Sequence, residues 1–106
     1  MTFHEIDALE SITCEVTQDD IDNGQLGFWS ASPIAFAVCR TLGLHRKSAI
    51  VGPRCPEEGE ITVYPGPARF LCNTFSHTPE SAQFTDDFDN GKKVEPATFI
   101  LKRWPK

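Results

Sequence analysis

Apolar and polar residues alternate along residues 11–17, and this period of two predicts a half-buried strand. The apolar positions on its buried face are Ile12, Cys14 and Val16. Thr17 is a suitable N-cap, and Asp20 three positions later completes a capping-box pattern, so a short helix is predicted over residues 18–23. Gly24 is expected to end this helix by adopting a left-handed conformation.

The pair Ser32-Pro33 is the strongest helix-start signal in the chain, because serine caps helices and proline suits the first helical position. The residues that follow are apolar almost throughout, and Gly43 is expected to end the helix. A helix that is apolar on most sides is buried. We therefore predict that residues 33–42 form the central helix of the fold.

The second half of the chain contains further strand patterns. Apolar, β-branched runs between glycines and prolines predict strands over residues 48–52, 60–64 and 97–102. Residues 68–75 are ambiguous between strand and loop, and a strand is the favoured interpretation. Thr78-Pro79 repeats the N-cap signal and predicts a helix over residues 79–90, whose buried stripe would be Phe84 and Phe88.

These elements define a fold class. At 106 residues with ordinary apolar content, residues 1–106 are expected to form a single α+β domain. Its mostly antiparallel sheet of four or five strands would pack on the central helix (about 33–42) and the second helix (about 79–90). No apolar run is long enough to span a membrane, and the acidic N-terminal segment does not resemble a signal peptide, so a cytoplasmic location is expected.

The distribution of charge gives the first indication of function. Acidic and basic residues are segregated into separate segments of the chain, although the net charge is only −5. The first 39 residues contain no Lys or Arg, and their acids are Glu5, Asp7, Glu10, Glu15, Asp19, Asp20 and Asp22. The next block is basic, with Arg40, Arg46, Lys47 and Arg54. Such blocks describe partners and encounter rates rather than fold. The acids either serve only as a solvated surface or dock on a basic partner.

The sequence offers little support for catalysis. The four cysteines have no spacing typical of a zinc site, so reduced thiols, no metal site and no cofactor are expected. Cys14 and Cys39 lie in apolar stretches and are predicted to be buried. No histidine lies in a recognisable nucleophilic motif, and no catalytic residue is assigned. A small hydrolytic enzyme that uses Cys55 and a histidine remains the alternative.

The candidate partner-binding residues are two acidic triplets and two aromatic residues. Asp86, Asp87 and Asp89 lie near the end of the second helix, where negative charge opposes the helix dipole and only Lys92 and Lys93 follow to compensate. Together with Asp19, Asp20 and Asp22, which form the first acidic triplet, they would occupy a basic groove in the place of phosphates. Phe28 and Trp29 lie in a loop and are either interface anchors or part of the core. The full set is Asp19, Asp20, Asp22, Phe28, Trp29, Asp86, Asp87 and Asp89.

Three segments, VTQDDIDNG, SPIAFAVCRTLG and FTDDFDNGKKVEPATFILK, together resemble a family of small proteins encoded by phages and mobile elements. The function of this family is uncertain, and it has no established catalytic residues to assign here. In the family the central helix opens with Cys-Pro, whereas this chain has Ser32-Pro33, which weakens any metal or redox role there. The resemblance implies a phage setting, in which small acidic proteins often inhibit host defence, as anti-CRISPR and anti-restriction proteins do.

The sequence therefore leads to a functional hypothesis with alternatives. The favoured hypothesis is a non-enzymatic inhibitor that docks its acidic helices on a basic, nucleic-acid-handling host protein or nucleoprotein complex. It would not bind nucleic acid directly, because the net charge is negative. The alternatives are the Cys55 enzyme and a self-associating accessory phage protein, and the oligomeric state is left open.

Overall fold

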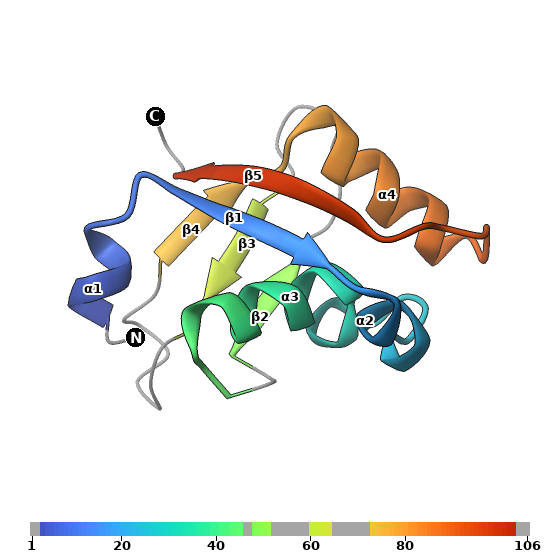
Figure 1. Cartoon of the computed structure of the whole chain (residues 1–106), viewed down its shortest axis with the longest axis horizontal. Helices are drawn as coiled ribbons and strands as arrows, with labels where there is room; N and C mark the ends of the chain where they lie inside the picture. Colours follow the sequence, from blue (N-terminus) through green and yellow to red (C-terminus); the bar gives the residue numbers. More distant parts are fainter. Residues whose placement is uncertain (1–2, 46–47, 52–59, 65–72, 104–106) are drawn as a thin grey trace.

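The structure is a computed structural model that describes residues 3–45, 48–51, 60–64 and 73–103 (Figure 1). Its strands are β1 (Ser11–Val16), β2 (Ala49–Val51), β3 (Glu60–Val63), β4 (Asn73–Ser76) and β5 (Ala97–Arg103). Its helices are α1 (Phe3–Asp7), α2 (Gln18–Asn23), α3 (Pro33–Leu42) and α4 (Pro79–Asp89), with a 3-10 turn at Trp29–Ala31. The described strands form one antiparallel sheet in the order β1-β5-β4-β3-β2. The predicted α+β class is confirmed.

The sheet curls because its two parts, the pair β1–β5 and the strands β4, β3 and β2, are joined over only a short length. β1 pairs with β5 along its whole length, from Ser11 opposite Lys102 to Val16 opposite Ala97. β5 pairs with β4 only where Phe75 and Ser76 meet its last residues. The pair β1–β5 therefore crosses β4, β3 and β2 at a wide angle, as Figure 1 shows.

Helix α3 lies inside this curl. It packs against both β1 and β2, which are the two edge strands of the sheet. Ile34, Ala35, Ala37 and Val38 are completely buried, so the helix is enclosed on several sides. The prediction of a buried central helix is confirmed.

Local signals set the helix ends much as predicted. The Ser32 hydroxyl accepts a hydrogen bond from the Ile34 N–H (3.3 Å), and Gly43 ends α3 with φ +67°. The Thr17 hydroxyl accepts from the Asp20 N–H (3.3 Å), while the Asp20 carboxylate accepts from the Thr17 N–H (2.9 Å). This reciprocal pair is the capping box that the sequence predicted.

Helix α1 was not predicted from the sequence. Its Ile6 is completely buried, and Arg103 at the end of β5 holds it in place. The Arg103 side chain donates hydrogen bonds to the carbonyl groups of Ile6 and Leu9, the latter at 2.7 Å. Its guanidinium also lies 5.0 Å from the centroid of the Phe75 ring. The two ends of the described chain are thus joined by one side chain.

The predicted strand over residues 68–75 is only partly described. β4 begins at Asn73, and residues 68–72 lie outside the described part of the chain. The strand predicted over 48–52 is described as Ala49–Val51, and Gly52 lies outside. The closing strand extends one residue further than predicted, because Arg103 still pairs with Phe75.

The sequence predicts correctly that Gly24 ends α2, but the predicted reason, a left-handed conformation, is wrong. Gly24 does end α2, but its φ is −69°, which any residue can adopt. A Cβ atom at this position would lie 2.8 Å from Cζ of Phe88 and 2.9 Å from Cδ of Pro33. Glycine is required here by the close approach of α4 and α3 to the end of α2, not by a left-handed conformation.

We predict that Gly24→Ala lowers the free energy of unfolding by about 1–3 kcal/mol, because the methyl group overpacks this junction. Urea denaturation of the purified chain would measure the loss. Shortening the opposing ring with Phe88→Leu should make the two changes non-additive, with a coupling of about 1 kcal/mol. Gly27→Ala is the control: its φ of +74° makes alanine strained there, but nothing lies within 4 Å of the added Cβ, so its cost should be additive with Phe88→Leu. Additive effects for Gly24→Ala would contradict the packing explanation.

Candidate partner-binding surface

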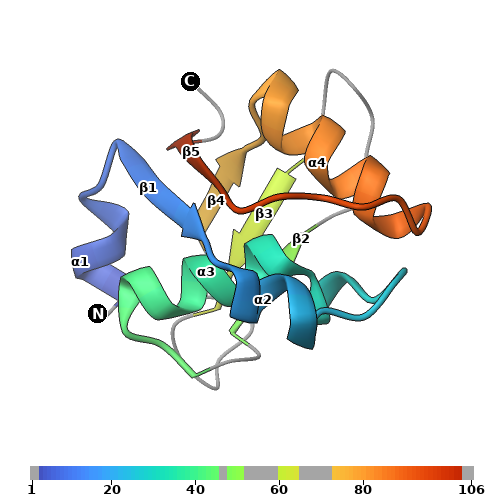
Figure 2. The same ribbon diagram turned by 45° about the vertical axis from the view of Figure 1, so that its right-hand side comes forward.

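Three segments that are distant in sequence meet at one end of the molecule. They are α2, the loop at residues 24–28 and the C-terminal part of α4, and all lie opposite α1 (Figures 1 and 2). The Gly27 N–H donates a hydrogen bond to the Asp89 carboxylate (3.2 Å), which fixes the loop to α4. Gly24 makes the second junction through its close approach to Phe88. We call these three segments the acidic end.

The loop exposes two large apolar side chains at this end. Leu26 is 55% exposed and Phe28 is 59% exposed, although most of the large apolar side chains that the structure describes are buried. The loop is nevertheless ordered by its own backbone, because Gln25 N–H donates to Ala31 O (2.9 Å) and Ala31 N–H donates to Phe28 O (3.0 Å). Of the two alternatives for Phe28, packing in the core is excluded by this exposure, and the side chain is available as an interface anchor. Trp29 begins the 3-10 turn, and its side chain lies outside what the structure describes.

The first acidic triplet is divided between surface and interior. Asp19 and Asp22 are exposed on α2, and Asp22 accepts a hydrogen bond from the Gln18 side chain (2.9 Å). Asp20 instead points inward, and only 6% of its side chain is exposed. This placement argues against the predicted role of Asp20 as a surface contact, so the acidic end keeps two of the three carboxylates.

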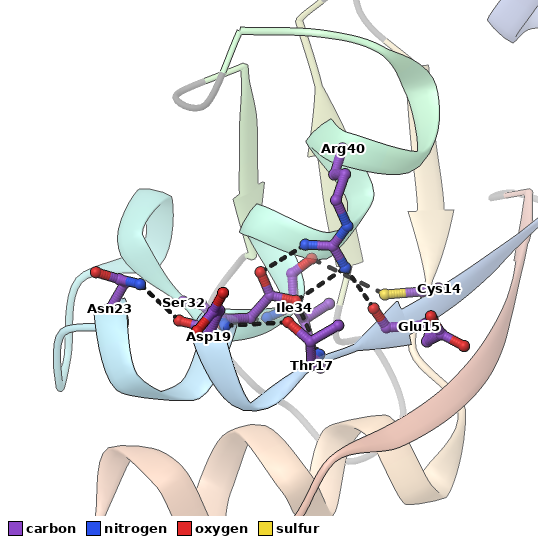
Figure 3. A network of polar contacts seen from close by, with 9 residues as sticks. Cys14, Glu15, Thr17, Asp19, Asn23, Ser32, Ile34 and Arg40 are labelled. Atoms are coloured by element: carbon purple, nitrogen blue, oxygen red, sulfur yellow. Dashed lines mark hydrogen bonds and ion pairs between the residues drawn. The ribbon is translucent and has the colours of Figure 1, made fainter.

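Asp20 forms a two-point ion pair with Arg40 from the last turn of α3. The guanidinium Nη1 lies 2.7 Å from one carboxylate oxygen and Nη2 lies 3.0 Å from the other. Nη2 also donates to the backbone carbonyl of Glu15 at the end of β1 (2.6 Å), as Figure 3 shows. The pair therefore joins α2, α3 and β1, and Arg40 does not belong to a free basic surface.

The environment of Asp20 changes its acidity. Burial alone would raise the pKa of this carboxyl group, but hydrogen bonds from Arg40 and from the Thr17 N–H outweigh burial and lower it below its ordinary value of 3.8. The same carboxylate raises the pKa of the Arg40 guanidinium, chiefly through that hydrogen bond. Both groups are therefore charged throughout the physiological range.

The second acidic triplet lies on α4 and is partly satisfied within the chain. Asp86 accepts from the Asn90 side chain (3.0 Å), and Asp87 accepts from Gln83 (2.9 Å). Asp87 also lies 3.9 Å from the Lys92 ammonium group, a distance at which an exposed ion pair contributes little. These neighbours reduce, but do not cancel, the negative charge at a helix end that has no basic residue in its last turn.

A shallow hollow of about 290 Å³ lies between α2, the loop and the end of α4. Four apolar residues line it, namely Ile21, Leu26, Phe88 and Val94, and its charged lining residues are Lys92 and Lys93. The rest of the lining is Gln18 and Gly91. The acidic end therefore carries its carboxylates on α2 and α4 outside an apolar hollow that two lysines also line. Sequence reasoning missed Leu26 and this hollow, although the triplet Gln25-Leu26-Gly27 already placed a leucine in a loop.

The enzyme alternative depends on Cys55, which the structure does not describe, so it stays a prediction, and only Cys14, Cys39 and the histidines can be placed. Burial raises the pKa of the Cys14 thiol to about 12, and it also raises the pKa of Cys39. His77 Nδ1 lies 2.8 Å from Ser81 Oγ, but Ser81 is completely buried and its hydroxyl caps α4. Cys55 lies outside the described residues. Among the residues that are described, no group of three His, Cys, Asp or Glu side chains is placed to hold a metal ion.

Comparison with protein-family models, with curated proteins and with solved structures finds no significant match to this chain. The fold and the acidic end are therefore interpreted from their own geometry. None of the described helices has the length and apolar character needed to cross a membrane.

We predict that Asp20→Asn lowers the free energy of unfolding at pH 7 by about 1–3 kcal/mol, because it removes a charge-assisted pair and leaves Arg40 without its partner. The folded-state pKa of Asp20 lies below its unfolded value, so the pair's contribution is complete above the unfolded pKa. It is lost as the pH falls through the folded-state pKa. The difference between the two proteins should thus shrink below about pH 4.

Urea denaturation at several pH values would check this expectation. The matched control is Asp19→Asn, one residue away and exposed, which should change stability by at most about 0.5 kcal/mol. A difference for Asp20→Asn that stays constant down to pH 2 would contradict the ion-pair explanation.

We also predict that Cys14 and Cys39 resist alkylation by iodoacetamide at pH 8 in the folded protein and react in urea, because buried thiols with raised pKa values contain almost no thiolate. Mass spectrometry of digested protein would identify the labelled positions. Rapid labelling of Cys14 without denaturant would mean that β1 and α3 open easily.

Proposed function

We propose that the protein is a non-enzymatic binding protein that docks its acidic end on a basic surface of a nucleic-acid-handling protein. In the setting that the family resemblance implies, that partner belongs to the host of a phage, and the effect is inhibition of the anti-CRISPR or anti-restriction kind. The observation that carries the proposal is the meeting of α2, the Leu26–Phe28 loop and the end of α4 at one end of the molecule.

Each part of this surface suits one step of binding. Exposed carboxylates such as Asp19 and Asp22 attract a basic surface over a distance of about a Debye length and speed association. Exposed apolar side chains such as Phe28 provide contact area after water is excluded, and such anchors contribute most of the energy in protein complexes. The bond between Gly27 and Asp89 holds the loop in place before binding, which reduces the entropy lost in the complex.

Competition with nucleic acid follows from the chemistry of the partner. Grooves that bind a nucleic-acid backbone rely on Lys and Arg. A surface with carboxylates on two helices and an apolar loop between them would occupy such a groove and exclude the natural ligand. Asp20 is left out of this surface because it is paired with Arg40.

We predict that reversing the charge of Asp19 and Asp22 together, with lysine at both positions, slows association with the partner roughly tenfold at low salt. The effect should weaken at physiological salt, because exposed charges are screened within about 8 Å there. A partner first captured on the immobilised protein from bacterial lysate would be purified for surface plasmon resonance. Single-stranded or double-stranded DNA or RNA should displace it.

The control is Asp7→Lys with Glu10→Lys, which makes the same change in net charge at the α1 end of the molecule. Both residues are exposed, but Asp7 lies 3.8 Å from Arg103, which holds α1, so circular dichroism would first verify that this control is folded. The proposal fails if the control slows association as much as the Asp19 and Asp22 variant does. It also fails if Phe28→Ser leaves the dissociation rate unchanged.

A further inference from the structure

A second hollow runs along α4 and differs from the one at the acidic end. This furrow of about 510 Å³ lies between α4 and the chain that returns from its C-terminus towards β5. One wall is a single face of α4, with Glu80, Gln83, Phe84 and Asp87 spaced three or four residues apart. The other wall is the segment 93–97, which Figure 2 shows passing in front of α4.

The floor of the furrow is apolar and firmly packed. The rings of Phe84 and Phe99 meet edge to face with their centroids 5.6 Å apart, and both residues are buried. Val94 and Ala97 are half-buried beside them and leave apolar surface open to the furrow. The floor can therefore cover an apolar side chain from outside without rearrangement of the core.

The charges at the rim favour a basic ligand. Three carboxylates line the furrow, from Glu80, Asp87 and Glu95, against one ammonium group, from Lys93, and Lys92 lies outside the lining at 3.9 Å from Asp87. Glu80 and Glu95 are exposed, and Glu95 meets Lys93 only at 3.8 Å. Glu80 and Asp87 are seven residues apart on α4, so their backbones are separated by about 10 Å along the helix axis. About three residues of extended chain cover the same distance.

The segment beside the furrow also has backbone groups to offer. Lys93, Val94 and Glu95 belong to neither a helix nor a strand, and within the described part of the chain their N–H and C=O groups make no backbone hydrogen bond. An extended peptide can bind by forming hydrogen bonds to such open backbone groups, so that backbone bonds provide affinity and side-chain pockets provide specificity.

We propose that the furrow binds an extended segment of a partner protein in which apolar residues are flanked by Lys or Arg. The apolar side chains would cover Val94 and Ala97, and the backbone would pair with residues 93–95. The basic side chains would meet the carboxylates of Glu80, Asp87 and Glu95. This inference rests on the proposed function, since it assumes that the chain acts by binding a protein, and it names the kind of segment that is held.

The test titrates the whole chain with three synthetic peptides, so it needs no partner. The first is Gly-Lys-Lys-Phe-Val-Lys-Lys-Gly, the second has Glu in place of every Lys, and the third has Gly in place of Phe and Val. Fluorescence anisotropy gives the affinities, and amide chemical shifts locate the bound peptide. The first peptide should bind at least about tenfold more tightly than either of the others, because only it satisfies both the floor and the rim. The largest shifts should fall on residues 93–95 and on α4.

Charge reversal provides the matched comparison. Glu80→Lys with Glu95→Lys should weaken binding of the first peptide about tenfold, whereas Asp7→Lys with Glu10→Lys should change it less than about twofold. Circular dichroism would verify that both variants are folded, and Glu80→Gln with Glu95→Gln is the milder substitute if the reversal is not. Equal binding of the acidic peptide, shifts centred on Leu26 and Phe28, or no binding of the first peptide would each overturn the furrow proposal. None of these results would affect the proposed function, because that proposal is tested by the capture of a lysate partner through Asp19 and Asp22. The failure of one proposal can therefore be distinguished from the failure of the other.

Discussion

The enclosure of α3 by the curled sheet is the constraint on which the rest of the structure depends. A helix with apolar residues on most sides must be covered on most sides, and one flat sheet cannot do this. In this protein β4 pairs with β5 only at Phe75 and Ser76, so the sheet can bend at that point. As a result, both edge strands, β1 and β2, contact α3. Replacing the small residues Ala35 and Ala37 with larger ones would push these strands apart.

The N-terminal end of α3 then decides where the acidic end forms. Pro33 lies against Gly24 at the end of α2, and Phe88 of α4 approaches the same glycine. Two helices that carry acidic triplets are thereby brought to one end by packing of apolar groups, not by attraction between their charges. Like charges would separate them, so the apolar junction and the bond from Gly27 to Asp89 must outweigh that repulsion. The two contacts therefore hold the candidate surface together.

Most helices and strands were predictable from the sequence because their signals are local. Ser32-Pro33 and Thr78-Pro79 mark helix starts through bonds that form within a few residues, and alternation along residues 11–17 needs no knowledge of the partner strand. Helix α1 was missed because five residues do not form a stable helix alone. It depends on Arg103, which lies 94 residues away from Leu9 in sequence. The inward turn of Asp20 was missed for the same reason, since Arg40 reaches it from another helix.

The contrast between Asp20 and the acidic residues of α4 affects how the two acidic triplets are interpreted. Asp20 is stabilised by Arg40 and by the Thr17 N–H at the start of a helix, where the dipole also favours a negative charge. Its presence is fully explained by folding. Asp86 and Asp87 lie at the opposite kind of helix end, where the dipole disfavours negative charge, and Asp87 meets Lys92 only at 3.9 Å. Neutral residues there would make α4 more stable on its own. The helix dipole thus accounts for the place of Asp20 but not for the place of the carboxylates at the end of α4, and for this reason the surface of α4 enters both proposals.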